Sequence, residues 1–530
     1  YEDLISFVRA SSSGRATALR PVSYGTELVT NGDFSSTDLS DWVTTNENQT
    51  VAVESGLLKV TTTASGVGAY QDITTVVGKI YRVEWEHTAG TATGVSFRVS
   101  NGAAYGGDLV NENATSGTEQ YAIFVATGST SRVYLRNGAT GTAKWDNFSV
   151  KEVLFDQPDG TLTLFEHPEN VPRVEYDADG NRLGLLVEES RTNLFAKSNV
   201  FKDGPWNETG AVVTPDAAVG PDGKTSASYL KPTAGDIEHR TIYSFSYTAD
   251  TYYTISVFAK KAELNYLAFR LNSQITTGGT ASWGQYVFDL ENGVLGVSSS
   301  TEDNRAVNRS IQDVGNGWYR CSVTVYGFGS SQLQIHVMKD NTVTAYWDGT
   351  GYTDQGIYIY GAQLEEASFP TSYIKNEGTF NGVTRSADVA SIPVADFGYN
   401  VKAGALVVNF NTPNALNDDR IAVISTGTTN RVIDIAKSGS NLVNYSDASG
   451  ADIIGSFVAE AKAAVSFKSA KEFASVQNGG EVQIDTTGNE VTKPTTLFIG
   501  SWATLNDRFP NGHIKSIKYY PRRLTNAQLQ

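Results

Sequence analysis

Residues 171–194, VPRVEYDADGNRLGLLVEESRTNL, decide how the chain is organised. Residues 172–176 and 183–187 each have the length and composition of a short β-strand. Between them, Asp179-Gly180-Asn181 supplies residues that readily adopt the positive φ angles of a tight turn. The stretch therefore predicts a β-hairpin, which leads through residues 188–194 into a new aromatic-rich segment.

The composition around this hairpin favours an all-β protein. The 530 residues correspond to about three or four domains of ordinary size. The chain contains 50 glycines and 26 tyrosines, with frequent Thr and Ser, as expected for many strands joined by turns.

The charge balance excludes some classes of partner. The chain carries 57 acidic and 41 basic residues, which gives a formal charge of −16. A nucleic-acid groove needs clustered Lys and Arg to neutralise phosphates, so we expect no nucleic-acid partner. The apolar runs are strand-length, far shorter than the ~20 residues of a membrane span, so we expect no membrane insertion. No signal peptide is visible, and the sequence leaves open what precedes Tyr1.

A single cysteine, Cys321, rules out an intramolecular disulfide framework. Residues 318–323, WYRCSV, have the alternation of a strand, so we expect Cys321 to be a small buried residue rather than a reactive thiol. The lack of disulfides fits assembly in a reducing cytosol.

Two separated motifs resemble phage tail and virion proteins. They are FVRAS at residues 7–11 and the pair VPRVEY and GLLVEESRTNL within residues 171–194. The resemblance implies that an N-terminal strip (1–23) docks with a hairpin collar (154–194). The block between them, residues 24–153, is then an inserted domain.

The inserted block has the pattern of a β-sandwich. Short alternating strands follow one another between Gly-, Thr-, Ser- and Asn-rich turns. Its ends, NGDF at residues 31–34 and WDNFSV at residues 145–150, resemble the galactose-binding-like jelly rolls of carbohydrate-binding modules attached to cellulases and xylanases. That resemblance implies a structural calcium ion held by Asp146 with Glu27 or Asp33 and backbone carbonyls.

Residues 195–375 repeat the plan of the inserted block, so we predict a second jelly roll. Its ending, GAQLEEASFPTSYI (361–374), again resembles phage and marine bacterial tail modules. After a polar linker (376–391), residues 392–530 end in NGHIKSIKYYPRRLTNAQL, which resembles the closing strands and last short helix of concanavalin or laminin-G lectins. The predicted fold is tandem β-sandwich (jelly-roll) domains plus a C-terminal concanavalin-like sandwich.

Catalytic motifs are missing from the sequence. The five histidines are scattered, without HExxH or HxH spacing, and neither a G-x-S-x-G elbow nor a P-loop occurs. A pair of carboxylates facing one cleft, as glycoside hydrolysis requires, is left open by the sequence. The acids fall mostly at turns or on the polar faces of strands, where solvation accounts for them.

The aromatic residues are the better indication of function. Sugar rings stack their C–H faces on Trp and Tyr while their hydroxyls bond to Asn, Asp, Gln and Arg. The candidates for carbohydrate binding are Trp347, Trp502, Tyr105, Trp283, Asp507 and Arg508. The alternative for each aromatic is a place in a sandwich core. Trp347 and Trp502 are favoured as binding residues because they stand in Gly/Asp/Asn/Thr-rich loops, away from any alternating run.

These patterns predict a non-enzymatic phage surface protein, such as a tail fibre or spike, that binds host-surface glycans by weak sites multiplied by avidity. Its other partners would be virion proteins and copies of itself, with a trimer as the usual state of such appendages. Calcium is the only cofactor implied. Two alternatives stay open: a polysaccharide-degrading enzyme or its accessory region, and a purely architectural virion component.

Overall fold

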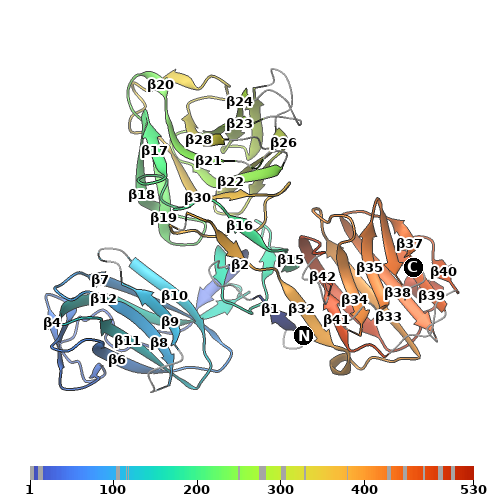
Figure 1. The fold of residues 1–530 in the computed structure, drawn as a ribbon, viewed down its shortest axis with the longest axis horizontal. Helices are drawn as coiled ribbons and strands as arrows, with labels where there is room; N and C mark the ends of the chain where they lie inside the picture. The colour runs from blue at the N-terminus through green and yellow to red at the C-terminus, as the bar shows by residue number, and fades with distance from the viewer. Residues whose placement is uncertain are drawn as a thin grey trace. The chain divides into compact units, whose positions relative to one another are not determined.

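The computed structural model describes the chain in segments, with gaps between them: residues 5–9, 16–102, 108–114, 116, 119–246, 248, 251–273, 282–299, 306–326, 330–378, 380–426, 431–445, 451–468, 472–486, 493–502 and 508–530. Almost all regular structure is antiparallel β-sheet, which confirms the predicted fold class (Figure 1). The chain divides into two compact units, Pro21–Thr161 and Tyr1–Arg20 together with Leu162–Gln530.

The smaller unit is a sandwich of two sheets, the first sandwich. One sheet has the strand order β4 (Gln49–Glu54), β5 (Leu57–Thr62), β12 (Gly141–Phe155), β7 (Ile80–Thr88) and β10 (Glu119–Val125). The other has the order β3 (Val43–Thr44), β6 (Val67–Thr74), β11 (Thr130–Asn137), β8 (Ser96–Asn101) and β9 (Asp108–Asn113). Buried Phe34, Trp85, Phe97 and Trp145 fill the space between the sheets, because successive strand residues point to opposite faces.

The larger unit contains a second sandwich built on the same plan. One sheet has the order β17 (Trp206–Thr209), β21 (Arg240–Ser246), β28 (Ser330–Met338), β23 (Tyr266–Ser273), β24 (Ser282–Asp289) and β25 (Val294–Ser298). The other has the order β18 (Ala211–Val219), β19 (Thr225–Pro232), β30 (Ile357–Glu365), β22 (Tyr252–Lys261), β27 (Tyr319–Tyr326) and β26 (Ala306–Asp313). β20 (Asp236–Glu238) and β29 (Tyr346–Asp348) form a separate pair.

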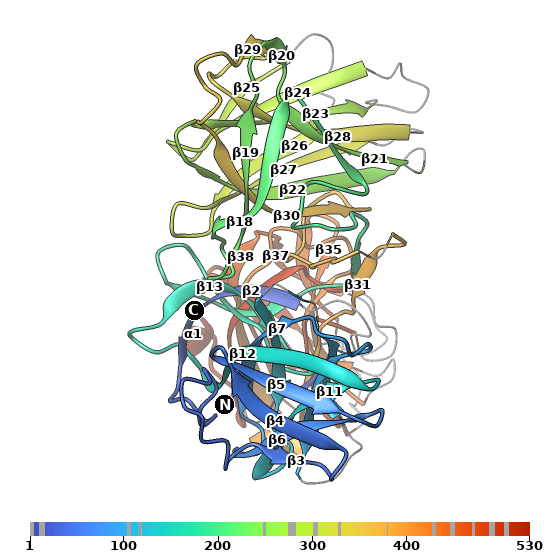
Figure 2. The same ribbon diagram turned by 90° about the vertical axis from the view of Figure 1, so that its left-hand side faces the viewer.

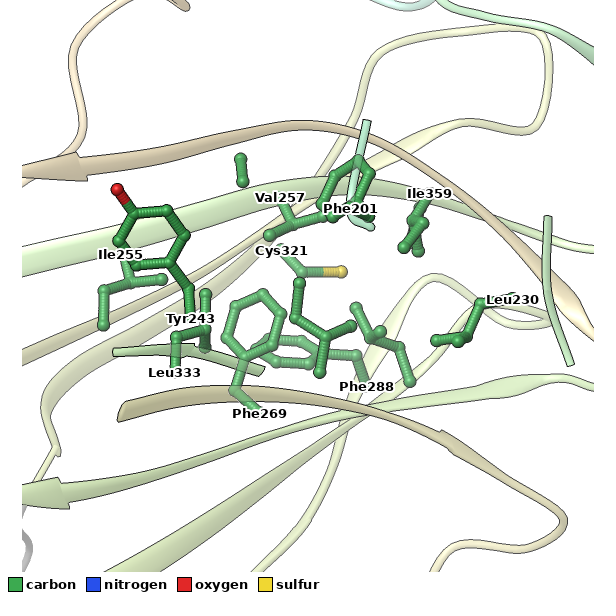
Figure 3. Packing of buried hydrophobic residues seen from close by; sticks show 14 of the residues in the cluster. Phe201, Leu230, Tyr243, Ile255, Val257, Phe269, Phe288, Cys321, Leu333 and Ile359 are labelled. Carbon is green, nitrogen blue, oxygen red and sulfur yellow. The ribbon is translucent and has the colours of Figure 1, made fainter. Parts of the chain in front are cut away.

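The strand order of the first sandwich thus recurs in the second, with β20, β25, β26 and β29 added. Figure 3 shows the core of the second sandwich, where Cys321 lies among Val257, Phe269 and other apolar side chains. Burial raises the pKa of the Cys321 thiol well above its ordinary value. Cys321 is therefore the buried, unreactive residue that the strand pattern predicts.

A third sandwich contains the C-terminal part of the chain. One sheet has the order β1 (Ser6–Val8), β32 (Val389–Pro393), β41 (Thr496–Ile499), β34 (Arg420–Ser425), β35 (Arg431–Ser438), β36 (Asn441–Tyr445) and β37 (Ala451–Ser456). The other has the order β14 (Val174–Tyr176), β15 (Arg182–Val187), β42 (Gly512–Tyr520), β33 (Ala403–Asn411), β38 (Glu460–Lys468), β39 (Glu472–Gln477) and β40 (Gln483–Asp485). The chain ends with α1 (Asn526–Leu529), whose first turn is closed by a capping box of Thr525 and Gln528.

The third sandwich includes segments that the sequence assigns elsewhere. β1, from the N-terminal strip, pairs with β32, and hairpin strand β15 pairs with β42. The segment at 376–391, expected to be a linker, contains β31 (Val383–Arg385), which pairs with β16 (Arg191–Asn193). The hairpin turn is as predicted, with Gly180 at a φ of 79°. However, β42, the strand with which β15 pairs, lies more than 300 residues further along the chain. A pairing over that distance leaves no local signal in the sequence.

The strip, the hairpin and the segment before β32 meet in a buried ion network. Arg173 Nη2 binds Glu188 Oε2 at 2.8 Å and also pairs with Asp388. Arg9 Nη1 lies 3.2 Å from Asp388 Oδ1, and Arg385 Nη2 lies 3.4 Å from Glu188 Oε2. The motif residues of FVRAS, VPR and VEES therefore join one set of buried charges, which we call the collar network.

Candidate functional site

The outer face of the β17–β25 sheet gathers polar side chains in the second sandwich. Along β21, β28, β23 and β24, every second residue points away from the core, and Figure 2 draws these strands as one layer. The register sets Arg240 opposite His336, and it sets Arg270 opposite Gln334 and Gln285. Guanidinium, imidazole and amide groups therefore lie on one side of the sheet, which we call the second arginine face. His336, Gln334 and Gln285 are buried there, whereas Arg240 and Arg270 are partly exposed.

One carboxylate on the outer side of these strands binds two guanidinium groups. Glu238 ends β20, and its side chain is only 6% exposed. Its Oε1 accepts a hydrogen bond from Arg270 Nη1, and its Oε2 pairs with Arg240 Nη1. Burial lowers the pKa of Arg240 while Glu238 acts in the opposite direction; because guanidinium groups titrate so far above neutral pH, the arginine stays charged. The triad carries one surplus positive charge.

The amide and imidazole groups extend the triad. Gln334 Oε1 accepts from Arg240 Nη1 at 2.6 Å and lies 3.2 Å from His336 Nε2. Burial, together with Arg240 and Arg270, holds the pKa of His336 well below its ordinary value, so the ring is neutral at pH 7. Nε2 then donates to Gln334, which leaves His336 Nδ1 as an acceptor without a donor among the described residues.

Two exposed aromatic rings flank the triad. Trp283 on β24 is 41% exposed, and the guanidinium of Arg270 lies 5.3 Å from its ring centre. Tyr346 on β29 is 58% exposed and stands opposite Glu238 in the β20–β29 pair. The face therefore combines exposed aromatic side chains with guanidinium donors that Glu238 holds in place.

The first sandwich has a related surface on its β3–β9 sheet, which corresponds in strand order to the β17–β25 sheet of the second sandwich. Arg132 on β11 stands opposite Asp72 on β6 and binds its carboxylate with both Nε and Nη2, at 2.7 and 2.8 Å. The same guanidinium lies 3.6 Å from the ring centre of Tyr70. This bidentate and stacked geometry fixes the Arg132 side chain over the ring.

Two more arginines complete this first arginine face. Arg98 on β8 pairs with Asp108 at 3.0 Å, and it stands opposite Tyr134 in the register. Arg136 points to the same side as Arg132, and no ion pair connects it to any residue that the structure describes. The face therefore holds three arginines against the carboxylates of Asp72 and Asp108.

Of the predicted binding residues, Trp283 lies on the second arginine face. Trp347 does not, and its predicted place in a loop is wrong: the residue lies on β29, only 5% exposed, in the core of the second sandwich. Its Nε1 donates to Val337 O at 3.3 Å, and its ring packs edge-on against His239. The Gly- and Asp-rich residues that suggested a loop belong to the turn after β29, while the indole itself points into the core.

Trp502 is also buried, at 6% exposure. The guanidinium of Arg420 lies 5.1 Å from its ring centre, and that of Arg508 lies 5.7 Å away. The predicted association of Trp502 with Arg508 is therefore present, although the ring is covered. Tyr105 and Asp507 lie outside the described residues.

The carboxylates predicted to bind calcium have different surroundings. Glu27 Oε1 accepts from the backbone N–H groups of Leu28, Val29 and Val150 at 2.8–3.0 Å, and Oε2 accepts from the Ser149 hydroxyl. Through these four hydrogen bonds, the Glu27 carboxylate joins two segments of the chain. It does not fit the role of a cation ligand.

Asp146 and Asp33 fit an oxygen site better. Burial raises the pKa of Asp146, and the neighbouring charges of Glu86 and Asp33 raise it further. Two carboxylates whose charges repel offer the kind of oxygen ligands that Ca²⁺ takes. Within the described ranges, however, no group of three or more His, Cys, Asp or Glu side chains is placed to hold a metal ion.

The sequence analysis missed the residues that build the two faces: Tyr70, Asp72, Arg98, Arg132, Arg136, Glu238, Arg240, Arg270, Gln334, His336 and Tyr346. They come from separate strands, so no local motif links them. One signal was available, because Arg270 interrupts the apolar run of residues 267–271 in β23. An arginine at an outward position of such a strand marks a polar surface rather than a core.

The third sandwich contains an open cleft of about 750 Å³ between its two sheets. Its walls are largely apolar, with Leu185, Ile499 and Ile517 among them. Asp396 is the single carboxylate among the described lining residues, so the cleft does not present a pair of acids. No helix within the described ranges has the length and apolar character needed to cross a membrane.

Comparisons with known proteins give similarity only at the level of solved structures. No protein-family model matches the chain, and no curated protein matches it. A structure titled "CBM4 structure and function" is 16% identical with a TM-score of 0.21, covering 23% of this chain and 99% of that one. The CBM22-1-CBM22-2 tandem domain of Paenibacillus barcinonensis Xyn10C is 12% identical with a TM-score of 0.20, covering 68% of this chain and 100% of that one.

A sialidase of Trypanosoma rangeli, solved with sialic acid, is similar at 11% identity and a TM-score of 0.22, covering 99% of this chain and 97% of that one. Carbohydrate-binding modules and a glycan-cleaving enzyme thus both occur among the similar structures. At these values the comparisons do not select a ligand or a reaction, so the assignment below is argued from the residues themselves.

Proposed function

We propose that the protein binds glycans through the two arginine faces and does not transform them. The observation that carries this proposal is Trp283, whose ring is 41% exposed directly beside the guanidinium of Arg270. A sugar ring stacks its C–H surface on such an indole, while its hydroxyl groups accept hydrogen bonds from the neighbouring guanidinium groups.

The hydrogen-bond network that includes Arg270 supports a binding role. Glu238, Gln334 and Arg240 are joined by hydrogen bonds and ion pairs, so the donors are already oriented before a ligand arrives. A pre-oriented site loses less side-chain freedom on binding. Glu238 itself is engaged by two arginines, and this does not favour the role of a general acid.

The place of the protein is a further part of the proposal. The FVRAS, VPRVEY and GLLVEESRTNL motifs resemble those of phage tail and virion proteins, so we place the chain on the virion surface, in a tail fibre, spike or similar appendage. Host-surface glycans would be its ligands and other virion proteins its neighbours. Oligomerisation, with a trimer as the usual state, would multiply weak sites by avidity.

A calcium ion in the first sandwich is proposed with Asp33 and Asp146 as carboxylate ligands. When bound, the ion would neutralise the repulsion that raises the pKa of Asp146. Its role would be to stabilise the sandwich, and it takes no part in ligand recognition.

The test is binding of the purified chain to a glycan array and to host cells, with the same mixtures examined for released oligosaccharide. Saturable binding without product, weakened by Trp283→Ala, is the expected result. Tyr252→Ala is the matched control, because Tyr252 is 43% exposed on a strand of the other sheet. Release of product would replace the proposal with an enzymatic function, and failure to bind any surface would favour an architectural role.

A further inference from the structure

We propose that the ligand of the two arginine faces is an anionic polysaccharide, whose acidic groups pair with guanidinium groups next to Trp283 and Tyr70. This inference rests on the proposed glycan-binding function and adds the charge class of the glycan. Two observations support it. Each face carries one more positive than negative charge, and Arg270 has N–H donors without a hydrogen-bond partner among the described residues.

On the second face, two arginines share one carboxylate. Arg270 uses only Nη1 to bind Glu238, so its Nε and Nη2 donors have no hydrogen-bond partner among the described residues. Its side chain is 24% exposed and that of Arg240 is 16% exposed. A guanidinium has five N–H donors in a planar fork, and most of those on Arg270 remain available to a ligand.

On the first face, Arg132 and Arg98 each have one aspartate as a partner, and Arg136 forms no ion pair with any described residue. The surplus is again one positive charge, that of Arg136, on the same side of the sheet as Arg132 and Tyr70. The two faces reach the same balance with different residues: a shared glutamate in one case and two separate aspartates in the other.

This surplus stands out against the charge of the whole chain, which is −16. The net charge would repel a polyanion at long range, so a polyanion ligand requires local positive charge at the contact surface. A neutral glycan needs hydrogen-bond donors and acceptors at the contact surface but no net charge there. The unbalanced guanidinium groups therefore point to acidic sugars.

The acidic group of the sugar is one that a guanidinium group binds through two hydrogen bonds, either a carboxylate or a sulfate. In both cases the acidic group would bind Arg270 while the ring stacks on Trp283, 5.3 Å away from that guanidinium. The experiment below separates the two sources.

The test measures binding of the wild-type full chain to a polyuronate, to the same polymer after reduction of its carboxyl groups to alcohols, and to a sulfated polysaccharide. Binding to the polyuronate that is lost on reduction supports a carboxylate ligand; binding to the sulfated polymer alone supports a sulfate ligand. In either case 0.5 M salt should weaken binding several-fold.

Equal binding to the native and reduced polymers would overturn this inference and leave the proposed glycan binding intact. Failure of the chain to bind any glycan, acidic or neutral, would contradict both.

Variants of Arg270 test the site with a matched control. Arg270→Gln should weaken polyuronate binding roughly 10-fold or more, because a charge-assisted hydrogen bond is lost. Arg270→Lys should give an intermediate loss, since lysine cannot form the bidentate contact. Lys231→Gln removes one positive charge on the other sheet, where Lys231 lies 3.5 Å from Asp354, and should leave binding unchanged. A loss as large in Lys231→Gln would show that only overall charge matters and would contradict the site.

Discussion

Arg173 and Asp388 are 215 residues apart in the sequence and form an ion pair in which both side chains are fully buried. Arg173 directly precedes β14, the first strand of the hairpin, and Asp388 directly precedes β32. Arg9 adds the N-terminal strip to the same carboxylate. The collar network therefore fastens three distant parts of the larger unit with charges that water does not reach.

Breaking this network should be costly. Glu188→Gln removes the carboxylate shared by Arg173 and Arg385 and leaves both guanidinium groups with one buried partner fewer. We expect the free energy of unfolding to fall by about 3–5 kcal/mol, measured by chemical denaturation of the full chain. Glu377→Gln, at a residue whose side chain is 76% exposed, is the control and should change stability by less than about 0.5 kcal/mol.

The Glu188 carboxylate also predicts that the stability of the larger unit depends on pH. Burial acts to raise the pKa of Glu188, but the charges of Arg385 and Arg173 outweigh it and hold the pKa well below its ordinary value. A depressed carboxylate pKa gives stability above the unfolded value of 4.5 and loses it as the pH falls further. The melting temperature of the larger unit should therefore drop below about pH 4.5, and Glu188→Gln should show a shallower slope there. Equal slopes in the two proteins would contradict the assignment.

The pKa of Asp146 is shifted in the opposite direction to that of Glu188. Its raised pKa means that ionisation costs folding free energy as the pH rises through the folded-state value. In a chelator at pH 7, Asp146→Asn should therefore raise the melting temperature of the first sandwich. Added calcium should stabilise the wild type and have little effect on the variant; stabilisation of both proteins by the same amount would place the ion elsewhere.

The two tryptophans of the second sandwich should respond differently to truncation. Trp347→Ala should lower stability by about 3–5 kcal/mol, because it leaves a cavity in the core. Trp283→Ala should change stability by less than about 1 kcal/mol, since its ring is 41% exposed. Thermal unfolding of both variants checks this contrast; a similar loss in each would mean that Trp283 is a core residue.

Much of the fold could be predicted from local patterns. Alternation in segments such as 81–85 and 252–257 marks strands, since one side chain in two must reach the core. The repeat of the sandwich plan was visible in the sequence, because NGDF (31–34) followed by Trp42 in the inserted block is matched by Asn199-Val200-Phe201 followed by Trp206 in the second sandwich. The pairing of β1 with β32 and of β15 with β42 was not visible, because sheet register between distant segments depends on tertiary packing.

The binding faces show the same limit. Trp283 was identified from its aromatic character, whereas Arg240, Arg270 and Glu238 come from three strands whose juxtaposition no spacing encodes. Trp347 was misjudged as a loop residue, since it lies on β29. Trp502 does lie in the segment between β41 and β42, as predicted, but it is buried. The polarity of neighbouring residues does not reveal where an indole points. In both cases the burial of the ring depends on tertiary contacts, with Val337 and His239 for Trp347 and with Arg420 for Trp502.

The most direct test of the account is the affinity of the full chain for a glycan that it captures on an array, compared among wild type, Trp283→Ala and Tyr252→Ala. We expect Trp283→Ala to weaken binding at least about 5-fold, as loss of an aromatic contact worth ~1 kcal/mol or more requires, and Tyr70→Ala added to it to weaken binding further. Tyr252→Ala should bind as the wild type does. Unchanged affinity in Trp283→Ala, with the wild type binding saturably, would contradict the claim that the arginine faces are the glycan-binding sites.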